Sequence, residues 1–324
     1  MGEFANDDEF YKWILPIFYL FEKEQSRFEA IWKQFSNEII FNNRFSPKTE
    51  IISEIKKTSD AATRFLNNNS LLFRARIFDR NPYESYLKAY QKIEQVTEEE
   101  FTQMLEFSQT HRATMDAVFS TFTEETLSDP NNQNNPILIA YNNWKKNRFK
   151  GFNAKESLPP PTNQVVAGRA NPDHIRYLYL SEDEETPLYE VRPTIGQYVS
   201  VAKFKTIQKL KIFDLTQIPT NNADNSLPSL FTVISKKFSA PYSGNPIEYL
   251  PTQYITEVIK NMGFDGLCFA SSLHEEGKNI VIFDVNTCIP ISSVLVQIKQ
   301  IHLESELPSL FKCIEANGED KSNK

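Results

Sequence analysis

The stretch GRANPDHIRYLYLSEDEETPLYEVRP, residues 168–193, decides the predicted fold and the predicted site of this chain. A strand-like run, HIRYLYL, follows Arg169 and Asn171 and comes before Glu190 and Arg192. The planar guanidinium of arginine matches the oxygens of a phosphate, and a carboxylate near a sugar can support positive charge that develops there. The segment therefore suits a phosphorylated nucleotide.

The second half of the chain alternates short β-type runs with helical patterns. The runs are rich in Val, Ile, Phe and Tyr and read HIRYLYL, YVSVAKF, KLKIFDL, LCFAS and NIVIFDV. Helices are predicted near residues 228–238 and 252–262, and Gly263 after the second suits a C-terminal cap. Residues 165–290 are thus predicted to mix helices and strands.

The first half of the chain is nearly free of glycine and is predicted to be helical. Its segments EKEQSRFEAIWKQF and TEEEFTQMLEFSQT carry apolar residues three and four apart, and Thr97 with Glu100 forms a capping box. Residues 127–164 are rich in Asn and Pro and are predicted to be an irregular connection. Taken together, the two halves indicate an α+β fold.

Composition excludes several classes of protein. The net charge of −7 argues against nucleic acid as a partner, because binding it relies on clustered Lys and Arg. Three cysteines without CxxC spacing favour a reducing cytoplasm over a disulfide framework. The apolar patch at 10–21 contains Lys12 and Pro16 and is too short to span a membrane, so we expect no membrane contact. With only four scattered histidines, no metal site is expected.

Four blocks of sequence, in order, resemble the RES domain family over roughly residues 70–290. They are LFRAR at 72–76, GRAN at 168–171, TPLYEVRP at 186–193, and GFDGLCFASS at 263–272 with the strand that begins at Asn279. The resemblance implies an α+β, ADP-ribosyltransferase-like RES domain over 67–315, with an insert at about 95–164. It also allows a helical, HEPN-like N-terminal domain at 1–66, and the tail at 316–324 is predicted to be disordered.

The resemblance further implies the chemistry and the residues of the site. The expected activity is cleavage of the nicotinamide–ribose bond of NAD+, in a bacterial toxin or defence effector. Glu190 is expected to stabilise the cationic transition state, and Arg74 and Arg169 to hold the pyrophosphate, with Arg76 as an alternative. A further set is expected to contact the dinucleotide: Ser271 or its rival Ser272, Asn171, Arg192, and Tyr179 stacked on the nicotinamide.

Several alternatives stay open at this point. The acceptor of the ADP-ribose group could be water, phosphate, or a protein or nucleic-acid target, which would make the chain a glycohydrolase, a phosphorylase or an ADP-ribosyltransferase. An inactive NAD+-binding or assembly module is a further alternative. Because a free NAD+ hydrolase harms its own cell, an antitoxin or an infection trigger is expected as a partner, and the N-terminal helices are candidates for a homo-oligomer surface.

Overall fold

The computed structural model describes residues 7–301, apart from residues 46, 48, 122–128, 130, 131, 133, 149, 218–228, 242 and 243. The predicted disordered tail at 316–324 lies outside these residues. The strands described are β1 Thr63–Leu66, β2 Leu71–Ile77, β3 Leu178–Ser181, β4 Tyr198–Thr206, β5 Leu210–Asp214, β6 Gly266–Ala270, β7 Lys278–Ile282 and β8 Cys288–Gln297. The α-helices described are α1 Asp7–Asn37, α2 Glu50–Thr58, α3 Glu84–Glu94, α4 Glu98–Thr110, α5 Arg112–Ser120, α7 Pro136–Asn147, α8 Ala154–Ser157, α9 Thr186–Glu190, α10 Leu230–Ser239 and α11 Leu250–Asn261. Shorter turns of helix are η1 Glu38–Asn42, η3 Thr162–Gln164, η4 Pro246–Tyr249 and η5 Val285–Thr287.

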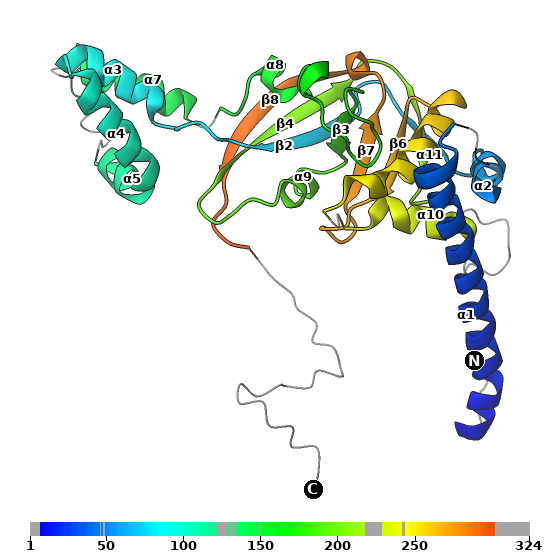
Figure 1. Cartoon of the computed structure of the whole chain (residues 1–324). Coiled ribbons are helices and arrows are strands. Elements are labelled where there is room, and N and C mark those ends of the chain that lie inside the picture. Colours follow the sequence, from blue (N-terminus) through cyan, green and yellow to red (C-terminus); the bar gives the residue numbers. More distant parts are fainter. Residues whose placement is uncertain are drawn as a thin grey trace, which may run out of the picture.

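The described strands form one eight-stranded sheet in the order β1-β5-β6-β7-β3-β2-β4-β8. The pair β5 and β6 is parallel, and the other neighbours are antiparallel. Strands β2 and β3 are paired only at Phe73 and Ser181. The short helix α9 lies on one side of the sheet and α8 on the other (Figure 1). The sheet is therefore weakly joined at its centre, next to the residues predicted to form the site.

The predicted α+β class is confirmed, and most predicted elements of the second half are found. The five β-type runs overlap β3, β4, β5, β6 and β7, and α10 and α11 overlap the two predicted helices. Gly263 has the positive φ of +83° that the predicted C-terminal cap requires. In the first half, Thr97 and Glu100 form the predicted capping box at the start of α4.

The predicted irregular connection at 127–164 is wrong in its middle, because α7 lies there. Asn135 caps this helix by accepting hydrogen bonds from the N–H groups of Ile137 and Leu138, and Pro136 occupies its first turn. Proline suits that turn, since its missing N–H would have no partner within the helix. Asn135 and Pro136, at the end of the Asn-rich stretch, thus form a helix start.

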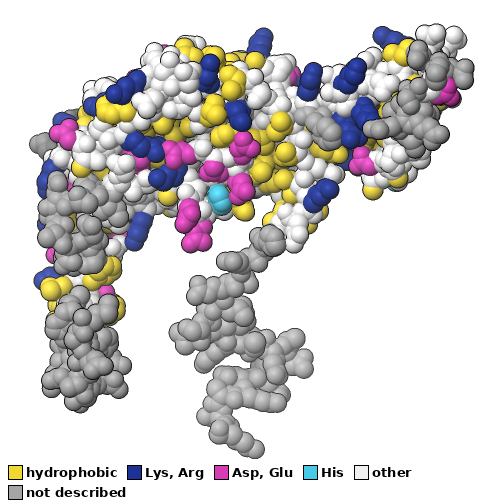
Figure 2. Space-filling model, turned by 180° about the vertical axis from the view of Figure 1, so that it is seen from behind, with side chains coloured by type: hydrophobic (Ala, Val, Ile, Leu, Met, Phe, Trp, Pro, Cys, Tyr) yellow, Lys and Arg dark blue, Asp and Glu magenta, His cyan; other side chains and the backbone are white. Residues whose placement is uncertain are grey.

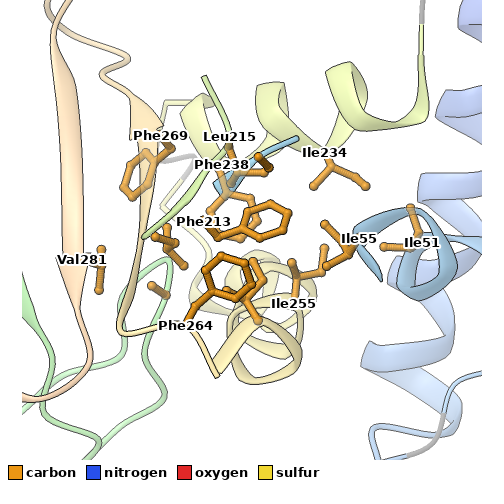
Figure 3. Close-up of a cluster of buried hydrophobic side chains, with 14 of the residues drawn as sticks. Ile51, Ile55, Phe213, Leu215, Ile234, Phe238, Ile255, Phe264, Phe269 and Val281 are labelled. Carbon is orange, nitrogen blue, oxygen red and sulfur yellow. The ribbon is translucent and has the colours of Figure 1, made fainter. Parts of the chain in front are cut away.

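The N-terminal helices share the main core with the sheet. Phe35 of α1 and Ile51 and Ile55 of α2 belong to one buried cluster with Phe213 of β5 and Phe269 of β6. Figure 3 shows the isoleucines of α2 facing the phenylalanines of the sheet and of α10. The predicted boundary at residue 66 therefore falls within a continuous core, and β1, at 63–66, is itself an edge strand of the sheet.

The segment between β2 and β3 contains a helical unit with its own core. Helices α3, α4, α5 and α7 bury an aromatic cluster that includes Tyr83, Phe119 and Trp144. The ring of Tyr83 stacks on the rings of Phe119 and Trp144, whose centroids lie 5.3 and 5.7 Å from its own. Figure 1 shows this unit standing beyond the β8 side of the sheet. This helical unit begins at α3, before residue 95.

The shared core predicts that α2 stabilises the whole fold. We expect Ile55→Ala to lower the free energy of unfolding by about 2–5 kcal/mol, because Ile55 is completely buried and its loss leaves a cavity. Denaturant unfolding followed by circular dichroism measures this. Ile139→Ala, at a residue that is 46% exposed on α7, is the matched control and should change stability by less than about 0.5 kcal/mol. Equal effects of the two changes would show that α2 lies outside the main core.

Candidate active site

The floor of the candidate site is one row of side chains across four strands. Phe269 pairs with Asn279, Asn279 with Ser181, and Ser181 with Phe73. Directly paired residues in a sheet point to the same face, so this row lies at one level beneath α9. All four residues line a cavity of about 490 Å³. The row thus places two polar groups, Ser181 and Asn279, between two aromatic rings.

Glu190 is the carboxylate of this cavity, and one of its oxygens is fixed by two donors. Oε1 accepts a hydrogen bond from Ser271 Oγ at 2.7 Å and another from Asn279 Nδ2 at 2.7 Å. Ser181 Oγ donates in turn to Asn279 Oδ1 at 3.0 Å, which fixes the orientation of the amide. Within the described residues, Oε2 has no hydrogen-bond partner and is available to a ligand.

Ser271 joins the loop after β6 to this carboxylate. Its hydroxyl donates to Glu190 and accepts hydrogen bonds from the backbone N–H groups of Leu273 and His274, both at 3.1 Å. The hydroxyl is therefore fully engaged in positioning Glu190. Ser272, its predicted rival, lines the cavity directly.

The helix α9 that carries Glu190 is anchored at its start by Asp183 and His274. Asp183 accepts hydrogen bonds from the N–H groups of Glu185 and Thr186 and from the Thr186 hydroxyl. Burial opposes its ionisation, but these hydrogen bonds lower the pKa of Asp183 below its ordinary value. His274 Nδ1 lies 2.8 Å from Thr186 Oγ1, and its ring stacks on that of Tyr189 with centroids 4.7 Å apart. The loop after β6 therefore holds α9 at two points, one of them Glu190 itself.

His274 was not predicted as a site residue from the sequence, where Glu275 and Glu276 follow it. Its Nε2 is 3.9 Å from the Glu185 carboxylate, whose side chain is exposed. Figure 2 shows acidic side chains gathered around a histidine near the middle of the face seen from behind. A phosphate group would therefore have to be held by arginines, because the surrounding surface carries negative charge.

Arg169 enters the cavity from the loop before β3 and is held by backbone carbonyls. Its Nη1 donates to the carbonyl oxygen of Lys237 at 2.9 Å, and its Nη2 donates to that of Ala240. Both carbonyls belong to the end of α10, where the helix dipole favours a positive charge. Burial lowers the pKa of Arg169, while Tyr249 and Glu190 act in the opposite direction. The guanidinium is thus fixed within electrostatic range of Glu190.

Tyr179 lines the cavity and is oriented by the turn that contains Arg169. Its hydroxyl donates to Asn171 Oδ1 at 2.7 Å and accepts from the Ala170 N–H at 3.0 Å. Asn171 itself is 3% exposed and does not line the cavity, so it supports Tyr179 from behind. At Gly168 a Cβ atom would lie 2.7 Å from Asn171 Oδ1 and 2.9 Å from the Tyr179 hydroxyl. The glycine of the GRAN block is therefore required by close packing.

The two arginines of β2 turn away from Glu190. Arg74 borders the cavity, but its Nη1 donates to the carbonyl oxygen of Ser157 at 2.5 Å, at the end of α8. Arg76 donates to the carbonyl oxygen of Glu156 and does not line the cavity. Burial, together with the positive charges of Arg76 and Arg176, lowers the pKa of Arg74 to about 10. The hydrogen bonds to Ser157 and Glu156 thus direct both guanidinium groups toward α8 rather than toward α9.

Glu190 and Arg192 do not lie on a strand. Glu190 is the last residue of α9, and Arg192 follows it with a positive φ of 47°. Pro187 of the motif TPLYEVRP lies in the first turn of α9. The Asp183 carboxylate accepts a hydrogen bond from the Thr186 N–H group at that end of the helix. Both residues nevertheless line the cavity. The described residues contain no ion pair between Glu190 and Arg192.

Asn279 is the main site residue that sequence reasoning missed. In the sequence it was only the first residue of a predicted strand. Its role depends on the register that pairs it with Ser181 and Phe269. Phe238 and Tyr249 also line the cavity and were not predicted. The available signal for Asn279 was a polar residue at the start of an apolar strand.

A comparison with protein-family models supports the family resemblance. The family model of the RES domain matches residues 143–303, which include Arg169, Glu190 and Ser271 and leave Arg74 outside. The chain is therefore a RES-domain family protein. Among solved structures, it is similar to the crystal structure of the M. tuberculosis MbcT-MbcA toxin-antitoxin complex, with 14% identity over 40% of this chain and 72% of that chain, and a TM-score of 0.28. A search of curated proteins found no match.

The part of the chain that the structure describes contains neither a candidate membrane span nor a candidate metal site. No described helix is both long and apolar enough to cross a membrane. No three or more His, Cys, Asp or Glu residues gather there as a group that could hold a metal ion. Cys268 and Cys288 are buried as free thiols, and Cys313 lies outside the described residues.

The contacts of His274 predict that it holds α9 in place. We expect His274→Ala to speed amide hydrogen exchange in the peptide covering residues 186–192, because it removes both the Thr186 contact and the Tyr189 stack. Mass spectrometry of exchanged peptides measures this. His174→Ala is the control, since His174 is exposed and its ring nitrogen contacts only the carbonyl oxygen of Thr162. Unchanged exchange in α9 would contradict an anchoring role.

Proposed function

We propose that this chain is an NAD+-cleaving enzyme that breaks the bond between nicotinamide and ribose. The observation that carries the proposal is the Glu190 carboxylate, which lines the cavity with Oε1 held by Ser271 and Asn279. The cavity is of a size that small-molecule sites commonly have. Membership of the RES-domain family supports the same chemistry.

The proposed reaction develops positive charge at the ribose carbon C1′. The bond from C1′ to the nicotinamide nitrogen breaks, nicotinamide leaves with the electron pair, and the ribose acquires oxocarbenium character. Glu190 stabilises this cation, and its free Oε2 accepts a hydrogen bond from a ribose hydroxyl. The two hydrogen bonds to Oε1 fix the carboxylate before the substrate binds, so that it does not have to reorganise when the positive charge develops. Because the leaving group starts with a positive charge, the step needs no metal ion.

Arg169 is proposed to bind the pyrophosphate of the substrate. Two of its five N–H groups are used by the carbonyl oxygens of Lys237 and Ala240, which leaves three for phosphate oxygens. Backbone carbonyls hold the guanidinium without cancelling its charge. Arg192 lines the same cavity and is proposed as a second phosphate contact. Arg74 and Arg76 would need a change of side-chain conformation to reach the substrate.

The aromatic side chains of the cavity are proposed to receive the nicotinamide ring. Tyr179, Phe73 and Phe269 line the cavity, and the hydroxyl of Tyr179 is already engaged with Asn171 and Ala170. Its ring is therefore held rigidly, which lowers the entropy cost of stacking a ligand on it. Water attacking C1′ would give ADP-ribose and a proton, and phosphate would give ADP-ribose 1-phosphate.

The first test is nicotinamide release by Glu190→Gln. We expect the rate of release from NAD+ to fall by roughly 10²–10³-fold, because the amide keeps the shape of the side chain but removes the charge that stabilises the transition state. Chromatography of the products, with and without phosphate, measures the rate and separates hydrolysis from phosphorolysis. Glu185→Gln, the same change at an exposed residue just before α9, is the control and should retain activity. Equal activity of Glu190→Gln and the parent chain would overturn the proposal.

A second test concerns the two donors to Glu190. We expect Ser271→Ala and Asn279→Ala each to lower kcat about tenfold, the value of one hydrogen bond to a charged group. The double variant should lose less than the product of the two single losses, because the two side chains fix the same oxygen. Steady-state kinetics of nicotinamide release measures all three variants. Strictly multiplicative losses would show that the donors act independently of Glu190.

We further propose that the chain acts as a toxin that a partner restrains. Depletion of NAD+ would stop growth of the producing cell, so an antitoxin or a trigger is needed to keep the cell alive. Expression of the parent chain alone in a bacterial host should arrest growth and lower cellular NAD+, whereas Glu190→Gln should do neither. Normal growth with unchanged NAD+ during expression of a folded, active chain would argue against the toxin role.

A further inference from the structure

A second cavity adjoins the candidate active site on the side of the N-terminal helix. It has a volume of about 310 Å³ and is lined by Trp32 and Ser36 of α1 and Ile40 of η1. Its other walls come from the end of α10, from η4 and from the start of α11, and include Lys237, Glu248, Tyr249 and Thr252. None of the residues from α1 and η1 belongs to the part of the chain that the RES family model matches.

Arg169 and Tyr249 line both cavities and therefore form their common wall. The guanidinium of Arg169 lies over the rings of Tyr249 and Phe269, 5.6 and 5.9 Å from their centroids. Its carbonyl partners, Lys237 and Ala240, line the second cavity. A ligand whose phosphates bind Arg169 can therefore place one group on the Glu190 side and another on the Trp32 side.

We infer that the second cavity binds the adenosine half of the dinucleotide, so that α1 forms part of the substrate site. This inference rests on the proposed function, which places the nicotinamide riboside beside Glu190 and the pyrophosphate at Arg169. NAD+ carries its two nucleosides on opposite sides of the pyrophosphate, which matches two cavities that share one arginine.

The side chains of the second cavity suit a purine nucleoside. Trp32 and Tyr249 offer aromatic surface, on which a base can stack. Glu248 supplies a carboxylate that can accept hydrogen bonds from ribose hydroxyls or from the adenine amino group. The hydroxyl of Ser36 is buried and has no hydrogen-bond partner within the described residues. An unpaired hydroxyl in a cavity wall is costly unless a ligand or water satisfies it.

The position of α1 against this cavity is fixed by an ion pair and by the core. Glu29 of α1 accepts a hydrogen bond from Lys237 Nζ at 2.8 Å, and Lys237 is the residue whose carbonyl holds Arg169. Trp32 packs against the main core beside Phe35, with ring centroids 5.5 Å apart. The wall is therefore preorganised rather than assembled by the ligand, and this reduces the entropy cost of binding.

Two variants of α1 and one control test the inference. Trp32→Ala removes the aromatic wall, and Ser36→Phe fills the cavity without removing a core contact. Ser26→Phe makes the same chemical change at an exposed residue of α1 and is the matched control. Calorimetry with AMP and with ADP-ribose measures binding, and kinetics with NAD+ and with nicotinamide mononucleotide measures cleavage of substrates with and without adenosine.

We expect Trp32→Ala and Ser36→Phe each to raise the Kd of AMP about tenfold, in line with the loss of base stacking. The preference for NAD+ over nicotinamide mononucleotide, as a ratio of kcat/KM values, should fall about tenfold in both, and Ser26→Phe should change neither quantity. An unchanged AMP affinity and an unchanged ratio in both variants would overturn the inference even if NAD+ is cleaved. AMP binding that the two variants weaken, in a chain that releases no nicotinamide, would support the adenosine site and refute the proposed cleavage instead.

Discussion

The hydrogen bond from Asn279 to Glu190 is the contact on which the candidate site depends. It joins a central strand of the sheet to the one short helix that carries the carboxylate. A five-residue helix is not stable by itself, so its position must come from tertiary contacts. Ser271, His274 and Asp183 provide the other contacts, and all of them lie in loops at the same end of the sheet. The site is therefore as rigid as the sheet beneath it.

The main core extends this rigidity to the cavity walls. Phe238 and Phe269 line the cavity and are also members of the buried cluster that contains Ile51 and Ile55 of α2. Close-packed cores transmit a change in volume to their neighbours. The N-terminal helices thus support the cavity from behind. The helical insert, by contrast, buries a separate aromatic core. Sequence similarity to the RES family alone would have placed the N-terminal helices outside the domain.

The sequence predicted the positions of helices and strands better than it predicted the contacts between their side chains. Alternating Val, Ile and Phe located β4, β5, β6 and β7, because burial on a sheet selects those residues over a short range. The same reasoning did not predict the helix α9 in TPLYEVRP, although Asp183 and Pro187 are signals of a helix start that were present in the sequence. The role of Asn279 could not be predicted, since it follows from the register of three strands rather than from any local pattern. The direction of the Arg74 side chain depends in the same way on which face of β2 meets α8.

The manner in which Arg169 is held has a consequence for the anion that binds there. A carboxylate partner would neutralise the guanidinium, whereas the carbonyl oxygens of Lys237 and Ala240 fix its orientation and leave most of its charge for a ligand. Burial lowers the pKa of Arg169, so the charged form is held at some cost that a bound phosphate would offset. Glu190, whose negative charge acts on this arginine, is itself hydrogen-bonded to Ser271 and Asn279. The charges of Arg169 and Glu190 are therefore kept apart by their own hydrogen bonds. In the proposed function Arg169 serves the phosphates and Glu190 the cationic ribose, and a dinucleotide that carries both groups would satisfy them together.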